Sequence, residues 1–168
     1  AEPEEEESGL RAALGGVIAL WRDWASLALL FVLAIDFVVT GALDILGVAY
    51  AEDVLALAED GAGLLIGSLG VGGLIGAFAG ASLSQGRRLA RVVIGGAVLE
   101  GAAFALVPVW GLLAPAAVTL ALTGFGGAAT VVAGRTLLQR ATDDRILARV
   151  FAVQESTAFL ATAFGAAL

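Results

Sequence analysis

The sequence contains no cysteine, histidine, methionine, lysine or asparagine, and only 15% of its 168 residues are charged. Without cysteine or histidine, the chain can form no disulfide, no thiolate or imidazole metal site, and no cysteine nucleophile or Ser/His/Asp triad. This inventory excludes most enzyme classes, and we expect neither catalysis nor a bound metal or cofactor. The charged fraction is also well below the ~25% typical of soluble domains. A soluble monomeric domain is therefore not expected.

Apolar residues dominate instead: 60% of the chain is hydrophobic, and a further 23 residues are glycine. A helix needs roughly 20 apolar residues to cross a hydrocarbon core about 30 Å thick. We expect one transmembrane helix in each of five apolar runs, which cover approximately residues 25–46, 63–83, 92–109, 112–133 and 150–168. The sequence thus predicts an all-α polytopic membrane protein with a transmembrane domain over residues 25–168.

The first 24 residues are less apolar and divide into two parts. Residues 1–9 contain five glutamates and should form a solvated cytoplasmic linker; a signal peptide would begin with basic residues. Residues 10–24 place leucine, valine and isoleucine at three- and four-residue spacing before Trp21 and Trp24. This pattern predicts an amphipathic helix at the membrane interface, with the tryptophans at headgroup level.

The basic residues are all arginines, and none lies in the loop between spans one and two or in the loop between spans three and four. They precede the first span or lie between spans two and three and between spans four and five, as Arg11, Arg22, Arg87, Arg88, Arg91, Arg135, Arg140, Arg145 and Arg149. We expect a tight turn at residues 84–91 and a longer connector at 135–149. Residues 50–61, between spans one and two, carry four carboxylates and are expected to form a short extramembrane helix. Because short arginine-rich loops stay in the cytoplasm, we predict a multi-pass protein of the cell membrane with a cytoplasmic N-terminal tail.

Glycines in the second span recur at four-residue spacing, as Gly72, Gly76 and Gly80. This spacing places them on one helix face, where a neighbouring backbone can approach closely. One interpretation is a fixed packing seam between helices. The other is a seam that slides during a transport cycle.

Acidic residues inside the spans are the candidates for function, because a carboxylate at the bilayer centre costs about 2.5 to 3.5 kcal/mol and usually faces water or a partner. Asp36 lies near the middle of the first span, and Thr40 and Asp44 extend a polar stripe towards the outer face. The stripe is expected to line a cavity where carboxylates bind a proton or a cation; alternatively, Asp36 is a neutral helix contact and Asp44 is merely solvated. Glu100, in the third span, is either protonated against a neighbouring helix or facing water.

Charged residues at the inner ends of the spans form a second group. Glu155, near the start of the fifth span, is expected to pair with Arg149 or Arg135. Together with Arg87, Arg88 and Arg140, these residues are predicted to set the topology or to form a cytoplasmic gate. No phosphate-binding loop is predicted, because the glycine strings lie within apolar spans and no lysine follows them.

Two stretches of the chain resemble the C-terminal half of a major facilitator superfamily transporter. They are GAGLLIGSLGVGGLIGAFAGASLSQGRR at residues 61–88 and GRTLLQRATDDRILARVF at residues 134–151. The second is similar to the connector between the tenth and eleventh helices of efflux-type members, so the five spans would correspond to helices seven to eleven. Residues 82–88 depart from the pattern, because the aspartate that often accompanies these arginines is missing.

The resemblance implies proton-coupled efflux of small molecules by alternating access, with Asp36 at the depth of the substrate cavity. The phrases GALDIL, GRTLLQR and ARVF also resemble members that carry a cyclic nucleotide-binding domain after the transporter domain. The alternative function is therefore a transporter-like membrane anchor or sensor module for such a domain.

The expected partners follow from this resemblance. They are the lipid bilayer, a six-helix N-terminal half of the same chain, a small-molecule substrate and, in the alternative, the cyclic nucleotide-binding domain. Nucleic acid is not expected. Because the chain lacks an initiator methionine at Ala1 and stops within an apolar run at Leu168, we expect it to be a piece of a longer protein.

Overall fold

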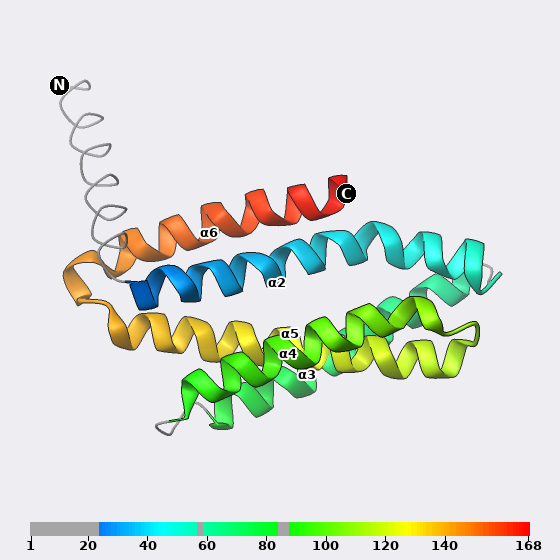
Figure 1. Cartoon of the computed structure of the whole chain (residues 1–168), viewed down its shortest axis with the longest axis horizontal. Helices are drawn as coiled ribbons and strands as arrows, with labels where there is room; N and C mark the ends of the chain where they lie inside the picture. The colour runs from blue at the N-terminus through cyan, green and yellow to red at the C-terminus, as the bar shows by residue number, and fades with distance from the viewer. Residues whose placement is uncertain (1–23, 57–58, 84–87) are drawn as a thin grey trace.

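The computed structural model describes residues 24–56, 59–83 and 88–168, and these residues are helical almost throughout. The elements are α2 (Trp24–Ala49), α3 (Glu59–Leu83), α4 (Leu89–Leu106), α5 (Leu113–Ala141) and α6 (Asp144–Ala167) (Figure 1). A π-helical turn, η1 (Tyr50–Val54), extends α2, and a 3-10 turn, η2 (Val107–Val109), follows α4. Each of the five α-helices contains a segment long and apolar enough to cross a membrane. The predicted all-α polytopic architecture with five spans is thereby confirmed.

The acidic linker predicted at residues 1–9 and most of the interfacial helix predicted at 10–24 lie outside the described residues. Elsewhere, α2, α3, α5 and α6 are each longer than their predicted apolar runs. The described part of residues 50–61 does not form the separate short helix that we expected, because its first residues continue α2 as η1 and its last begin α3. Between them, Ala56 adopts a positive φ of 49°, which ends the helix.

The connector expected at residues 135–149 is almost entirely helical. Helix α5 continues past residue 133 to Ala141, and α6 begins at Asp144, so only Thr142 and Asp143 separate the two helices. Hydropathy detects the apolar part of a helix, whereas arginine, leucine, glutamine and alanine are all strong helix formers. The polar stretch after residue 133 therefore lengthens α5 instead of forming a loop.

Helix α5 is the centre of the bundle. Helices α3 and α4 both pack along α5 and hardly contact one another, while α2 packs chiefly along α6 and also meets α5 (Figure 1). Two apolar clusters stabilise this arrangement, one around Leu33 and Leu138 and the other around Leu65 and Leu120. On α2, α4 and α5 alike, a short segment of chain separates the residues of one cluster from those of the other. The middle of the bundle lies between them.

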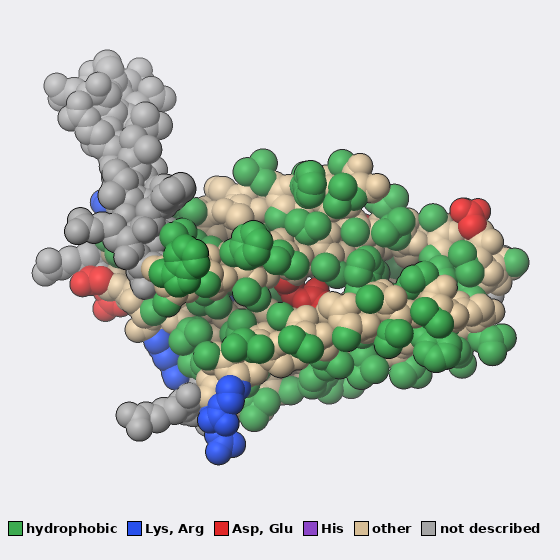
Figure 2. All heavy atoms as spheres, in the orientation of Figure 1, with side chains coloured by type: hydrophobic (Ala, Val, Ile, Leu, Met, Phe, Trp, Pro, Cys, Tyr) green, Lys and Arg blue, Asp and Glu red, His purple; other side chains and the backbone are tan. Residues whose placement is uncertain are grey.

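The outer surface is largely apolar. Large side chains such as Phe31, Phe78 and Phe159 are exposed, as expected for helices that face lipid. On the face shown in Figure 2, basic side chains lie only at the end where α3 finishes and α4 starts. We call this end, where α5 also finishes and α6 starts, the arginine-bearing end.

Candidate functional site

Two buried carboxyl groups meet in the middle of the bundle. Asp36 on α2 and Glu100 on α4 are each only 5% exposed, and a carboxyl oxygen of each lies against the same glycine of α5, Gly127. Two carboxylate charges close together in an apolar environment disfavour one another. The arrangement therefore favours a proton on one of the two carboxyl groups.

A glycine on α5 makes room for this pair. A Cβ atom added at Gly127 would lie 3.0 Å from Oδ1 of Asp36 and 3.2 Å from Oε1 of Glu100. The neighbouring Gly126 lies against α4 so closely that an added Cβ would be 2.7 Å from the backbone nitrogen of Glu100. Together the two glycines let the backbone of α5 approach α4 and leave space for both carboxyl groups against its surface.

The carboxyl pair lines a cavity of about 340 Å³ between α2, α3, α4 and α5. Figure 2 shows acidic atoms in a hollow near the middle of the molecule. Thr123 also lines the cavity, but its hydroxyl donates to the carbonyl oxygen of Thr119 at 3.0 Å. Oδ1 of Asp36 is buried and has no hydrogen-bond partner among the described residues. An acceptor is thus available for a proton or a water molecule, and none of the described residues that line the cavity is basic.

The polar stripe predicted on the first span divides in the structure. Asp36 and Thr40 both line the cavity, whereas Asp44 is exposed and does not. Glu100 lines the cavity from α4, although the sequence offered no reason to pair it with Asp36. The structure thus brings together two of the three acidic candidates within the spans.

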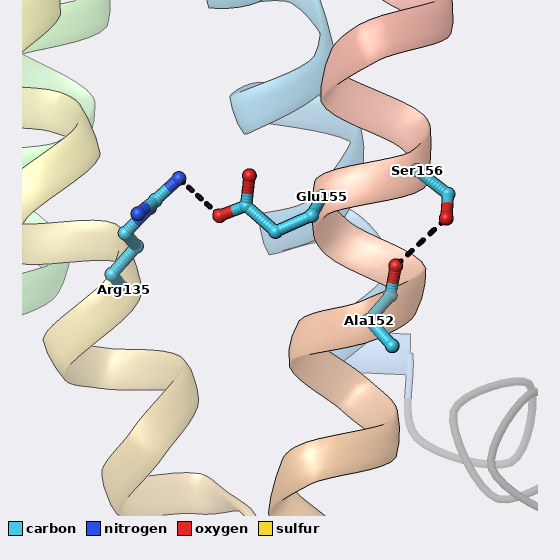
Figure 3. A network of polar contacts seen from close by, with 4 residues as sticks. All are labelled: Arg135, Ala152, Glu155 and Ser156. Atoms are coloured by element: carbon cyan, nitrogen blue, oxygen red, sulfur yellow. Dashed lines mark hydrogen bonds and ion pairs between the residues drawn. The ribbon is translucent and has the colours of Figure 1, made fainter.

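The charged group at the arginine-bearing end has a different geometry. Arg135 donates from Nη2 to Oε1 of Glu155 at 2.6 Å, across the gap between α5 and α6 (Figure 3). Their side chains are 39% and 47% exposed. Arg135 is therefore the partner that Glu155 takes, of the two that the sequence left open.

The other arginines predicted for a gate are solvent-exposed where they are described. This applies to Arg88, Arg140 and Arg149, while Arg87 lies outside the described residues. A gating role for this end stays a prediction.

The glycine stripe of α3 faces α5. Added Cβ atoms at Gly72 and Gly76 would collide with the backbone carbonyls of Ala121 and Phe125. At Gly80 the approach is looser, because an added Cβ would stand 3.1 Å from the nearest atom of α5. These contacts place α3 directly against the helix that supports the carboxyl pair.

Gly127 and Gln154 stand out in the structure, although neither is selected as functional from the sequence. Gly127 could be read only as one of several glycines in its span, because nothing local places two carboxyl groups over it. Gln154 on α6 is 2% exposed, and neither atom of its amide has a hydrogen-bond partner in the described part of the chain. A glutamine within an apolar run is the signal in the sequence that could have pointed to this position.

Fold and site together define a class of protein: a bundle of five membrane-length helices with a buried carboxyl pair halfway along. No group of three or more acidic or other potential metal ligands occurs within the described ranges. Comparison with protein-family models, with curated proteins and with solved structures found no match to this chain. A functional assignment therefore depends on the chemistry of the chain itself.

Proposed function

We propose that this chain is part of a secondary active transporter of the major facilitator superfamily, which exports small molecules by alternating access and is driven by protons. The carboxyl pair of Asp36 and Glu100 carries the proposal. Ionisable groups inside membrane bundles are costly and mark proton or ion pathways when they face a cavity. Here both acids line one cavity, and no basic residue is among its described lining residues.

A purely structural role accounts less well for this geometry. A structural polar contact in a bundle normally has all its hydrogen-bonding atoms satisfied, because an unpaired polar atom costs free energy. Oδ1 of Asp36 is buried and unpartnered within the described residues, yet its side chain lines a cavity of about 340 Å³. Binding and release of a proton there would change the charge of the site by one unit and favour different helix arrangements in the two states.

The distribution of charge supports an orientation. The described arginines gather at the end where α3 and α5 finish and α4 and α6 start (Figure 2). Under the positive-inside rule this end faces the cytoplasm. The cavity would then alternate between the two sides as this bundle rocks against the other half of the transporter.

Transport by the full-length protein in liposomes tests the proposal. A proton gradient is imposed, and the movement of a panel of lipophilic cations and antibiotics is measured. We expect Asp36→Asn and Glu100→Gln each to lower the proton-driven rate by about tenfold or more, within the range typical of coupling between two sites. Asp44→Asn is the matched control: an exposed aspartate on the same helix, outside the cavity, whose loss should leave the rate near that of the wild type.

Two outcomes would contradict the proposal. If Asp36→Asn transported with unchanged rate and pH dependence, the pair would not couple protons to transport. If the wild-type protein moved no compound under either direction of the gradient, the membrane anchor or sensor function would replace transport. Circular dichroism and gel filtration of each variant would confirm that the bundle is intact.

A further inference from the structure

A second cavity lies away from the carboxyl pair, at the arginine-bearing end. It is a groove of about 330 Å³ between α3 and α4, whose floor is the surface of α5. The groove exists because α3 and α4 each pack along α5 and hardly contact one another. Its apolar lining includes Leu83 of α3, Val92, Gly95 and Leu99 of α4, and Phe125 and Ala129 of α5.

Two arginines, Arg88 and Arg91, line the same groove. Both are exposed, and neither has a carboxylate partner among the described residues. No acidic side chain is among the described residues that line the groove. In addition, α4 begins directly after Arg88, and within the described residues no side chain caps its first turn. The positive end of the helix dipole therefore adds to the two guanidinium charges.

An apolar slot beside two unneutralised arginines has the chemistry of a lipid site. The surface around the groove is apolar and exposed in this bundle, since neighbouring side chains such as Ile94 and Val98 are more than half exposed. A hydrocarbon chain fills such a groove without the cost of burying water against apolar side chains. Arginine at headgroup depth binds phosphate through paired hydrogen bonds.

We propose that this groove binds an anionic phospholipid, with an acyl chain against α5 and the headgroup phosphate held by Arg88 and Arg91. A net negative headgroup is preferred because a zwitterionic lipid brings its own cation, which competes with the arginines for the phosphate. The site is separate from the carboxyl pair, and its test is a binding measurement that does not require transport.

The glycine on the groove wall offers a direct test. A Cβ atom added at Gly95 would meet no atom within 4 Å, so Gly95→Leu should place a side chain in the groove without disturbing the helix packing. Gly101, on the same helix, is equally open but does not line the groove, which makes Gly101→Leu the matched control. The full-length protein would be purified in detergent, incubated with phosphatidylglycerol or phosphatidylcholine, and examined by native mass spectrometry for retained lipid.

We expect the wild type to retain phosphatidylglycerol in preference to phosphatidylcholine, and Gly95→Leu to lose this retention while Gly101→Leu keeps it. Arg88→Gln and Arg91→Gln should each weaken phosphatidylglycerol binding roughly fivefold, and together about thirtyfold, as expected for arginines near anionic lipid. Arg149→Gln removes an exposed arginine from the same end without touching the groove and should change binding little.

Three results would overturn the proposal. The first is equal retention of the two lipids by the wild type. The second is unchanged phosphatidylglycerol binding in the Arg88→Gln, Arg91→Gln double variant, whose exposed positions leave folding intact even if Gly95→Leu fails to fold. The third is displacement of phosphatidylglycerol by glycerol phosphate alone, which would show an anion site that makes no use of the apolar groove.

Discussion

Acidic side chains occur at two depths of this bundle, and their surroundings differ sharply. In the middle, Asp36 and Glu100 are buried and line one cavity, and no basic residue is among its described lining residues. At the arginine-bearing end, Glu155 is nearly half exposed and pairs with Arg135 at 2.6 Å. The same type of side chain thus lies beside a second carboxyl group at one depth and beside a cation at the other.

The difference follows from the availability of water. A buried ion pair gains strong attraction but loses the hydration of both charges, and the loss can exceed the gain. Near the helix ends the two side chains keep part of their hydration, so a pair forms at little cost and contributes little. In the middle, a proton on one carboxyl group removes a charge altogether.

Helix packing changes along the same direction. In the middle of α3, Gly72 and Gly76 bring its backbone against that of α5, whereas Gly80, towards the arginine-bearing end, leaves more space. The tightest backbone contacts of α3 therefore lie closer to the level of the carboxyl pair than to that of the ion pair.

The largest expected effect comes from adding a side chain where the backbones of α3 and α5 are packed most closely. Gly76→Ala forces a methyl group into the backbone of α5 and should lower the free energy of unfolding by about 3 kcal/mol, the upper part of the range for overpacking. Gly80→Ala should cost no more than about 1 kcal/mol, since its neighbours can shift by a few tenths of an ångström. Denaturant titration in detergent micelles measures both.

Gly67→Ala is the control for helix propensity, because an added Cβ there meets nothing within 4 Å. It should stabilise the protein by about 0.5 kcal/mol or more, since alanine is the better helix former. Equal losses of stability in Gly76→Ala and Gly80→Ala would show that the difference in packing between the two positions does not affect stability.

Removing the central pair should have a smaller effect, of opposite sign. Asp36→Val combined with Glu100→Leu replaces two costly polar groups with apolar ones and should raise stability by about 1 to 2 kcal/mol while abolishing proton-driven transport. Thermal unfolding, followed by circular dichroism, measures the gain. A loss of stability larger than about 1 kcal/mol would instead identify the pair as a structural contact.

The smallest effect is expected at the ion pair. Glu155→Gln should lower stability by no more than about 0.5 kcal/mol, because both partners keep much of their exposure. The loss should shrink further when unfolding is measured in high salt, which screens exposed charges. A salt-independent loss of stability of about 2 kcal/mol or more would show that Arg135 and Glu155 behave as a buried ion pair and not as an exposed one.

Much of the fold was predictable, because roughly 20 apolar residues in a row leave few alternatives to a spanning helix. The face of α3 that carries Gly72 and Gly76 was predictable as well, since four-residue spacing fixes their common side. The pairing of Asp36 with Glu100 was not. It depends on how α2 and α4 both lie against α5, and no local pattern records that arrangement.

The polar extension of α5 was also missed. The last residues of α5, up to Ala141, have high helix propensity but are not apolar enough to be recognised as part of a membrane span. The predicted span therefore ended before the helix does. The boundary of the predicted span was set by composition, while the real boundary was set by hydrogen bonding within the helix.

The seam between α3 and α5 has one more property, which is its periodicity. Its glycines and the residues they face recur every four positions, with Gly72, Gly76 and Gly80 against Ala121, Phe125 and Ala129. Four residues correspond to about 6 Å along a helix. A displacement of α3 by that length would place each glycine opposite the next of these α5 residues. Close packing of the two helices would then recur at discrete positions of α3 along α5. Because the chain has no cysteine of its own, a cysteine pair introduced across this seam would report by crosslinking whether α3 occupies one such position or two.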